Sequence, residues 1–433
     1  MGILFSNVTA VLMDDAHTVL TGAYVQVEGS KIVYVGQDRP QGFSGKQING
    51  GGKVLMPGFV NAHSHIPMTL MRGYGGGHDL QDWLQNFIFP AEAKWDDRAI
   101  RAATQLGAAE MIASGITCTA DMYMRCDAII DELVKAGLSA NICCGATQFT
   151  PETDPEKMGD VHLHRELTEK WHGYGDGQIA IDASLHAEYT SYAAPALWEW
   201  TAQYAKDHGQ GLHVHLSETK KEHEECKARH GKTPAALFAG YGLFDVRAIA
   251  AHCVWTTPED WAILASHGVS AIHNPVSNLK LGSGVAPVPA MKKAGVNVAL
   301  GTDGVSSNNA TDFFSDMKLA AILHNGVNLD PMAVTAWEAL EMATVNGAKA
   351  LGRKTGRIAA GYDADLILID FDRPNLIPCH DVAENLVFSA HAADVVMNMC
   401  RGQVIYKDGQ FLTIDMDKVK QELTGHAMPR LFG

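Results

Sequence analysis

The sequence predicts an α/β fold, a parallel (β/α)8 TIM-type barrel with a small composite β-sandwich domain built from both chain ends. The 433 residues are 46% hydrophobic and 19% charged, which is enough for one large domain and a smaller one. Short apolar runs alternate with helix-like segments through the middle of the chain. Both ends instead contain short β-rich runs broken by turns.

The two chain ends have a similar pattern of short strands. The N-terminal region predicts a small antiparallel module with runs at 7–12, 23–27 and 31–35. The pattern returns near the C-terminus, at 365–370, 395–399 and 403–406. We therefore expect residues 1–56 and 357–433 to form one composite β-sandwich domain and residues 57–356 to form the barrel.

Eight apolar runs between these regions are the predicted barrel strands. They lie at 59–62, 116–121, 140–144, 179–183, 212–216, 248–253, 269–273 and 296–301. Intervening stretches such as 98–113 and 332–351 have helical periodicity or good helix formers. Nearly continuous apolar strands that alternate with helices favour a parallel barrel over a sandwich. The alternative is a doubly wound open sheet.

Metal-binding residue types end several of these strands. They are His63 and His65 at the end of the first strand, His215 at the end of the fifth, His252 at the end of the sixth and Asp303 at the end of the eighth. Residues two apart point the same way along a strand, so His63 and His65 can face one point. In a barrel the strand ends share one face, and imidazole with carboxylate suits Zn²⁺ or Fe²⁺. Singly each residue could cap a loop or a turn, but five on independently assigned strands predict a shared site.

Glu218 lies just beyond this predicted strand end, three residues after His215. That position makes it a candidate proton shuttle near the metal. It is also a first-turn carboxylate of the helix expected from 218 to about 229, where the helix dipole favours a negative charge. The two roles are compatible.

The charge balance indicates the kind of partner. Lys and Arg number 34 against 49 Asp and Glu, a net charge of −15 without a basic run that could follow a phosphate backbone, so we expect no nucleic-acid partner. The apolar runs are all well short of about 18 residues and the N-terminus lacks a basic segment, so we expect no membrane contact and a cytoplasmic location. Eight scattered cysteines without a Cys-x-x-Cys pair predict reduced, mostly core residues.

Five stretches spread over nearly the whole chain carry recognisable motifs. They are residues 57–65, 89–94, 215–219, 273–281 and 300–309. Together they resemble the amidohydrolase superfamily, and within it the methylthioadenosine/S-adenosylhomocysteine deaminase and chlorohydrolase branch. The resemblance implies a composite β module and a divalent metal, zinc with iron as the alternative. Its ligands would be His63, His65, His215 and Asp303, with Glu218 and His252 around the hydrolytic water.

The resemblance also implies substrate contacts, with Glu92 on a ribose diol and His186 on the nucleoside. From the residues alone, Glu92 is a helix-start carboxylate and His186 a polar loop residue. Relatives with two metals keep a bridging lysine or glutamate after the fourth strand, where this chain has residues 182–186 without either. We therefore expect one metal per chain.

One departure from the family pattern concerns the substrate tail. Family members that accept S-adenosylhomocysteine resemble this chain near the third strand but carry an arginine where residues 141–145 have none. That arginine would pair with a carboxylate. We therefore expect adenosine or an uncharged 5′-modified adenosine, such as 5′-methylthioadenosine or 5′-deoxyadenosine, ahead of S-adenosylhomocysteine.

The expected reaction is hydrolytic deamination of the 6-amino group to a 6-oxo purine with release of ammonia. Asp303 would bind the metal and accept a proton from water, Glu218 would protonate the ring nitrogen, and His252 would orient the water. The partner would be a small purine nucleoside, and the protein a homo-oligomer. Two alternatives stay open, a hydrolase of a guanine, pterin or triazine heterocycle, which Glu92 disfavours, and a non-catalytic scaffold.

Overall fold

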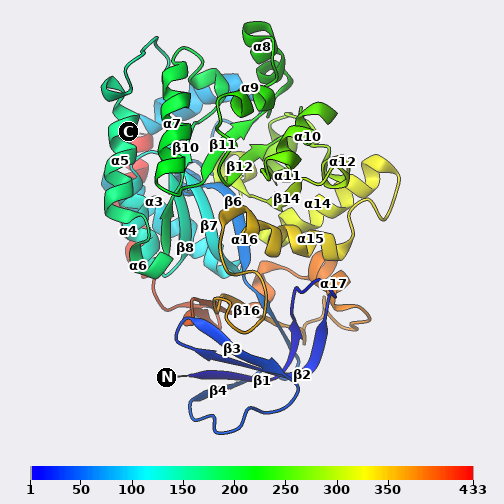
Figure 1. Cartoon of the computed structure of the whole chain (residues 1–433). Helices are drawn as coiled ribbons and strands as arrows, with labels where there is room; N and C mark the ends of the chain where they lie inside the picture. The colour runs from blue at the N-terminus through cyan, green and yellow to red at the C-terminus, as the bar shows by residue number, and fades with distance from the viewer. Residues whose placement is uncertain (1, 433) are drawn as a thin grey trace.

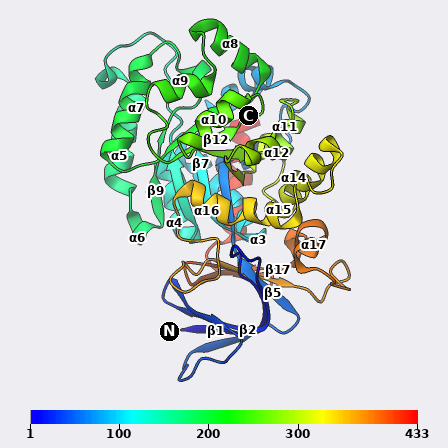
Figure 2. The same cartoon turned by 45° about the vertical axis from the view of Figure 1, so that its right-hand side comes forward.

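The computed structural model describes residues 2–432 and contains two regions. Figures 1 and 2 show parallel strands wrapped by helices in the larger region, with a smaller β-rich region below it. Both chain ends contribute strands to the smaller region. Within residues 2–432, no helix combines the length and the apolar character that crossing a membrane requires.

The smaller region is a nine-stranded sheet of order β19-β18-β17-β16-β5-β1-β2-β3, with β4 paired to β1. Its N-terminal strands are β1 (Ile3–Val11), β2 (Val19–Glu28), β3 (Lys31–Gly36), β4 (Lys46–Asn49) and β5 (Lys53–Pro57). Its C-terminal strands are β16 (Leu366–Asp370), β17 (Val395–Cys400), β18 (Gln403–Lys407) and β19 (Gln410–Phe411). The two sets meet where β5 runs antiparallel to β16. The expectation of an antiparallel N-terminal module is wrong in part, because β4 and β5 run parallel to β1.

The larger region contains two five-stranded sheets whose strands all pair in parallel. One has the order β15-β6-β7-β8-β9, made of β15 (Asp303–Gly304), β6 (Phe59–His65), β7 (Ile116–Met122), β8 (Ser139–Cys143) and β9 (Ile179–Ile181). The other has the order β10-β11-β12-β13-β14, made of β10 (Ala183–Ser184), β11 (Leu212–Leu216), β12 (Ala248–His252), β13 (Ser270–His273) and β14 (Asn297–Leu300). Only Asp182 separates β9 from β10, and two residues separate β14 from β15. Two segments of the chain therefore belong to both sheets.

Helices follow most of these strands. The longer ones are α3 (Asp97–Ala113), α4 (Cys126–Ala136), α5 (Gly159–Trp171), α7 (Pro195–Asp207), α8 (Lys220–His230), α10 (Pro258–Ser266), α14 (Phe313–Asn328), α15 (Ala336–Ala343) and α16 (Val345–Leu351). The shorter ones are α1 (Leu80–Trp83), α2 (Phe89–Glu92), α6 (Tyr174–Gly177), α9 (Pro234–Gly240), α11 (Pro275–Lys280), α12 (Val288–Lys293), α13 (Val305–Asn308), α17 (Val382–Glu384), α18 (Met416–Glu422) and α19 (Met428–Phe432). Short 3₁₀ and π segments are η1 (Ile66–Met71), η2 (Leu84–Ile88), η3 (Pro155–Lys157), η4 (Glu188–Thr190), η5 (Asn385–Ser389), η6 (Ala392–Asp394) and η7 (Leu423–Ala427). The helical stretch expected over 332–351 is two helices, because Thr344 leaves helical geometry at φ −131° and ψ −91°.

The parallel strands are buried on both faces. Small apolar side chains of β6, β7, β12, β13 and β14 form one cluster with residues of α16. Helix α16 packs closely there, since a Cβ atom at Gly347 would lie 2.9 Å from the backbone oxygen of Val60. On the outer face, Phe59 packs its ring 5.5 Å from that of Phe313 and 5.0 Å from that of Phe314. This packing fixes β6, whose C-terminal end carries His63 and His65.

Candidate metal centre

Three histidines and a carboxylate converge at the ends of β6, β11 and β15. Nε2 of His63 lies 3.4 Å and Nε2 of His65 lies 3.2 Å from Oδ1 of Asp303. Nε2 of His215 lies 3.4 Å from Nε2 of His65. Ligands of a tetrahedral zinc ion at about 2.05 Å would be separated by about 3.3 Å. These separations fit a single divalent cation.

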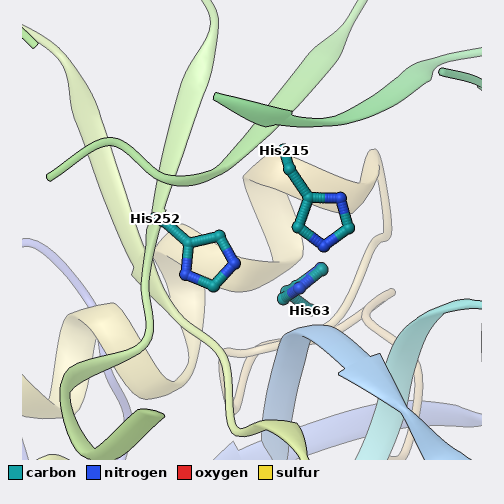
Figure 3. A group of neighbouring side chains, drawn as sticks. All are labelled: His63, His215 and His252. Carbon is teal, nitrogen blue, oxygen red and sulfur yellow. The ribbon is translucent and has the colours of Figure 1, made fainter. Parts of the chain in front are cut away.

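The fourth side chain near this point is His252 at the end of β12. Figure 3 shows the rings of His63, His215 and His252 turned toward one another. One ligand atom from each of these residues lies within 4.8 Å of the others. The fully buried Nε2 of His63 also lacks a hydrogen-bond partner among the described residues. A cation is stabilised where a buried nitrogen without a hydrogen-bond partner faces other ligand atoms.

The opposite nitrogen of each ring is held by an outer partner. Nδ1 of His65 lies 2.5 Å from the Met122 carbonyl oxygen, and Nδ1 of His215 lies 2.8 Å from that of His186. Because a carbonyl only accepts hydrogen bonds, both Nδ1 atoms donate and the Nε2 atoms face the centre.

His63 has a different outer partner, the imidazole of His213. Nδ1 of His63 lies 2.7 Å from Nε2 of His213, whose own Nδ1 lies 3.5 Å from Sγ of Cys143. For His63 to offer its Nε2 lone pair, its Nδ1 must donate to His213, and His213 then donates to the thiol. Sequence reasoning missed this role, although His213 and His215 repeat the spacing of His63 and His65.

Electrostatics at the centre depend on burial and on Asp303. Burial lowers the pKa of His63 to about 4 and that of His215 well below its usual value. Burial also opposes protonation of His65, but the adjacent Asp303 carboxylate raises the pKa of His65 to about 9. Burial alone would raise the pKa of Asp303, whereas its contacts with His63 and His65 hold it well below its usual value. His65 must release its proton to act as a ligand, so metal binding would release a proton.

Asp303 is itself fixed by hydroxyl groups. Its Oδ2 accepts hydrogen bonds from Ser277 Oγ at 2.6 Å and from Ser307 Oγ at 3.1 Å. Its backbone has a φ of 60°, in the left-handed region that residues other than glycine seldom occupy. The hydroxyls leave Oδ1 facing the histidines, and the strained backbone directs the side chain to that position.

Glu218 is almost completely buried beside His252. Its Oε2 lies 3.8 Å from Nε2 of His252, and its Oε1 accepts a hydrogen bond from Ser283 Oγ at 3.3 Å. Burial raises the pKa of Glu218. Nδ1 of His252 lies 2.8 Å from Oδ1 of Asn278, an acceptor that directs the other ring nitrogen toward Glu218.

A second glutamate, Glu222, shapes the turn that carries Glu218. Its carboxylate accepts the backbone N–H of Ser217 at 2.9 Å and that of Glu218 at 2.8 Å. Ser217 has a φ of 49°, so the turn needs this support. Thr219, which caps α8, accepts the N–H of Glu222. The sequence carried a signal for Glu222, a threonine followed three residues later by a glutamate, which is typical of a helix start.

A cavity of about 380 Å³ opens onto this centre. The predicted residues that line it are His65, Glu92, His186, His215, Glu218, His252 and Asp303. His63 is fully buried behind them. The structure thus brings all eight predicted site residues together.

Glu92 and His186 face the same cavity from different elements. Glu92 ends α2, and Tyr123 Oη donates a hydrogen bond to its Oε1. Burial raises the pKa of Glu92 to about 7, although the tyrosine hydrogen bond opposes the rise. Burial lowers the pKa of His186 to about 3, and its buried Nδ1 lacks a partner among the described residues. Both side chains therefore have capacity for hydrogen bonds to a ligand.

Comparisons with known proteins agree on one group. A model of the amidohydrolase family matches residues 54–405. The chain is 40% identical over 426 residues to a 5-methylthioadenosine/S-adenosylhomocysteine deaminase of Acetivibrio thermocellus, covering 97% of both chains. It is 38% identical over 420 residues to a 5′-deoxyadenosine deaminase of Methanosarcina barkeri, covering 97% of this chain and 96% of that one. An adenosine deaminase from Xanthomonas campestris with bound zinc has a similar structure, with a TM-score of 0.92, 30% identity and coverage of 99% and 98%.

Proposed function

Because the chain belongs to the amidohydrolase family, we propose that it is a metal-dependent deaminase that converts the 6-amino group of adenosine or of a 5′-modified adenosine to a 6-oxo purine. The observation that carries the proposal is the convergence of His63, His65, His215 and Asp303 beside Glu218. This set offers four ligand atoms and a protonatable carboxyl at the end of one cavity.

The parallel strands form, in this proposal, one closed (β/α)8 barrel. The pairing β15 to β6 and the continuity of β9 with β10 and of β14 with β15 support closure, since each of these segments belongs to both sheets. The nine-stranded sheet would be the composite β-sandwich domain of residues 1–56 and 357–433. Catalytic side chains then lie at the C-terminal face of the barrel, as in other barrel enzymes.

The metal would be one divalent cation, and zinc suits three imidazoles and a carboxylate at the observed separations. His63, His65, His215 and Asp303 would hold it. When bound, it would lower the pKa of a water molecule toward about 7. The similar adenosine deaminase with bound zinc supports zinc over iron.

The chain's own groups would then move the protons. Asp303 would accept a proton from the attacking water. Glu218, whose pKa is raised by burial, would be protonated and would donate to the ring nitrogen beside the attacked carbon. His252 would orient the water through Nε2 and stabilise charge on the tetrahedral carbon adduct. The C–N bond would then break as the amino group takes the proton held by Asp303 and leaves as ammonia, while Glu218 regains a proton from the hydroxyl of the adduct and the purine retains the oxygen.

Glu92 and His186 would bind the nucleoside. Tyr123 occupies Oε1 of Glu92, which leaves Oε2 for a ribose hydroxyl. A free base would offer this carboxylate no partner, so the arrangement argues against a guanine, pterin or triazine hydrolase. The donor set and its outer partners argue against a non-catalytic scaffold.

The test is ammonia release from adenosine, 5′-deoxyadenosine, 5′-methylthioadenosine, S-adenosylhomocysteine and guanine by protein of measured metal content. We expect turnover of the nucleosides and little of guanine. Turnover of guanine alone would favour the heterocycle alternative, and a fully metal-loaded protein inactive on all five would revive the scaffold. The expected homo-oligomer is tested by measuring the mass of the same preparation in solution.

A further inference from the structure

The cavity has a carboxylate that the deamination chemistry does not use. Asp160 lies in the first turn of α5 and lines the same cavity as Glu92 and His186. Its Oδ2 accepts the backbone N–H of Thr147 at 2.8 Å. Burial raises the pKa of Asp160, while hydrogen bonds from Thr147 oppose the rise and favour the ionised form. Thr147 thus holds this carboxylate in place, in the lining of the cavity.

Among the described residues, Asp160 pairs with no lysine or arginine in the cavity. Among the described residues that line it, Arg125 is the one lysine or arginine. The guanidinium of Arg125 donates to Asp97 Oδ1 at 2.6 Å, and its side chain is 44% exposed. Its positive charge is therefore already paired, on the solvent side. A ligand group that approaches Asp160 meets a net negative charge.

Asp160 lies beside His186, because Thr147, whose N–H it accepts, follows Ala146, and the Ala146 carbonyl oxygen accepts the backbone N–H of His186 at 2.9 Å. It follows β8 and the loop that begins at Cys144, and its charge adds to burial in raising the pKa of the Cys144 thiol. With the base at the metal and the ribose near Glu92 and His186, the 5′ substituent would extend toward Asp160.

We propose that Asp160 is the residue that selects the 5′ substituent, rejecting anionic groups and accepting a neutral hydrogen-bond donor or a cationic amine. The inference rests on the proposed nucleoside deamination and narrows its substrate class. S-adenosylhomocysteine carries an ammonium and a carboxylate on one tail, so its turnover alone does not report on Asp160. Substrates whose 5′ substituent carries a single charge do report on Asp160.

Three analogues isolate the effect. They are 5′-methylthioadenosine, its S-(2-carboxyethyl) analogue and its S-(2-aminoethyl) analogue, which are neutral, anionic and cationic. If the charged group of an analogue lies about 6 Å from the Asp160 carboxylate, at an effective dielectric constant of about 40, the interaction of the two unit charges changes binding about tenfold. For the wild-type protein we expect kcat/KM to fall in the order cationic, neutral, anionic.

The decisive variant is Asp160→Asn, which keeps an oxygen for the Thr147 N–H. We expect it to raise the kcat/KM ratio of anionic to neutral analogue about tenfold and to lower the ratio of cationic to neutral by a similar factor. Glu166→Gln, an equal charge change on the exposed side of α5, is the matched control and should leave both ratios unchanged. If Asp160→Asn folds poorly, Asp160→Ser keeps an acceptor for Thr147 and should shift both ratios in the same directions.

The outcomes separate this inference from the proposed function. A wild-type protein that deaminates the neutral analogue but whose ratios do not respond to either Asp160 variant overturns the role of Asp160 alone. A metal-loaded wild-type protein that deaminates none of the nucleosides overturns the proposed function. Ratios that respond equally to Glu166→Gln would show a general charge effect and would also overturn the role of Asp160.

Discussion

At the metal end of the cavity the side chains are held by outer partners, whereas the end near α5 is loosely built. His65 and His215 are fixed by carbonyl oxygens, and Asp303 by two serine hydroxyls. Near α5, Phe149 is 66% exposed. Rigid support is what catalytic geometry requires, while loops tolerate change. The contrast suggests that the reaction class is encoded at one end and substrate choice at the other.

The strongest test of the rigid end is Asp303→Ala. The change removes a ligand and the proton acceptor, so we expect metal content per chain to fall well below one and ammonia release to fall more than about 10⁴-fold. Metal analysis and activity on the same sample measure both. Asp207→Ala, at an exposed carboxylate of α7, should retain metal and activity. Full metal content in Asp303→Ala would contradict the ligand assignment.

Glu218→Gln separates proton transfer from metal binding at the same end. The amide keeps the shape of the side chain but cannot shuttle a proton, so we expect full metal content with kcat reduced about 10²–10⁴-fold. Near-normal turnover would remove Glu218 from its proposed role.

Substitutions of His213 test whether the outer hydrogen-bond partners of the proposed ligands contribute to metal affinity. His213→Leu leaves Nδ1 of His63 without an acceptor, and we expect metal affinity to fall about 10–100-fold in competition with a chelator. His213→Gln retains an oxygen that can accept this hydrogen bond and should recover part of the affinity. Equal affinities in both variants would show that His213 only fills space.

The smallest expected effect is the change in KM caused by a substitution of Tyr123. Its hydrogen bond lowers the pKa of Glu92, so Tyr123→Phe should raise that pKa above about 7. An ionised Glu92 is the stronger acceptor for a ribose hydroxyl, and its population rises with pH through the pKa. We therefore expect KM in Tyr123→Phe to rise about fivefold near pH 7, the equivalent of about one hydrogen bond. The difference in KM between Tyr123→Phe and the wild-type protein should narrow at higher pH. A ratio of these two KM values that does not change with pH would contradict this account.

The side chains proposed for the rigid end could be singled out from the sequence because their signals are local. His63 and His65 repeat the two-residue period of a strand, and Glu218 follows His215 closely. The family predicted from five motifs is confirmed by the match over residues 54–405. An α/β fold with parallel sheets was likewise predicted from alternating apolar and helical segments.

What sequence reasoning missed depends on contacts between distant residues. His213 matters because it meets His63, 150 residues away in the chain. Asp160 lies in the first turn of α5, which follows an irregular stretch after β8, and that stretch has no periodicity that would show where the helix begins relative to the cavity. The parallel pairing of β1 with β4 and β5 depends on strand order rather than on the strand residues. These features follow from tertiary packing, and no local pattern encodes them.

The pairing of β5 with β16 has a consequence for synthesis of the chain. Lys53 pairs with Asp370, so β5 is made about 300 residues before its neighbour. Until then the edge of the N-terminal strands has unpaired N–H and C=O groups that can pair with another chain. During translation this strand edge would thus be exposed to pairing with other chains until β16 is made, and a chaperone that shields strand edges would raise the yield of folded protein.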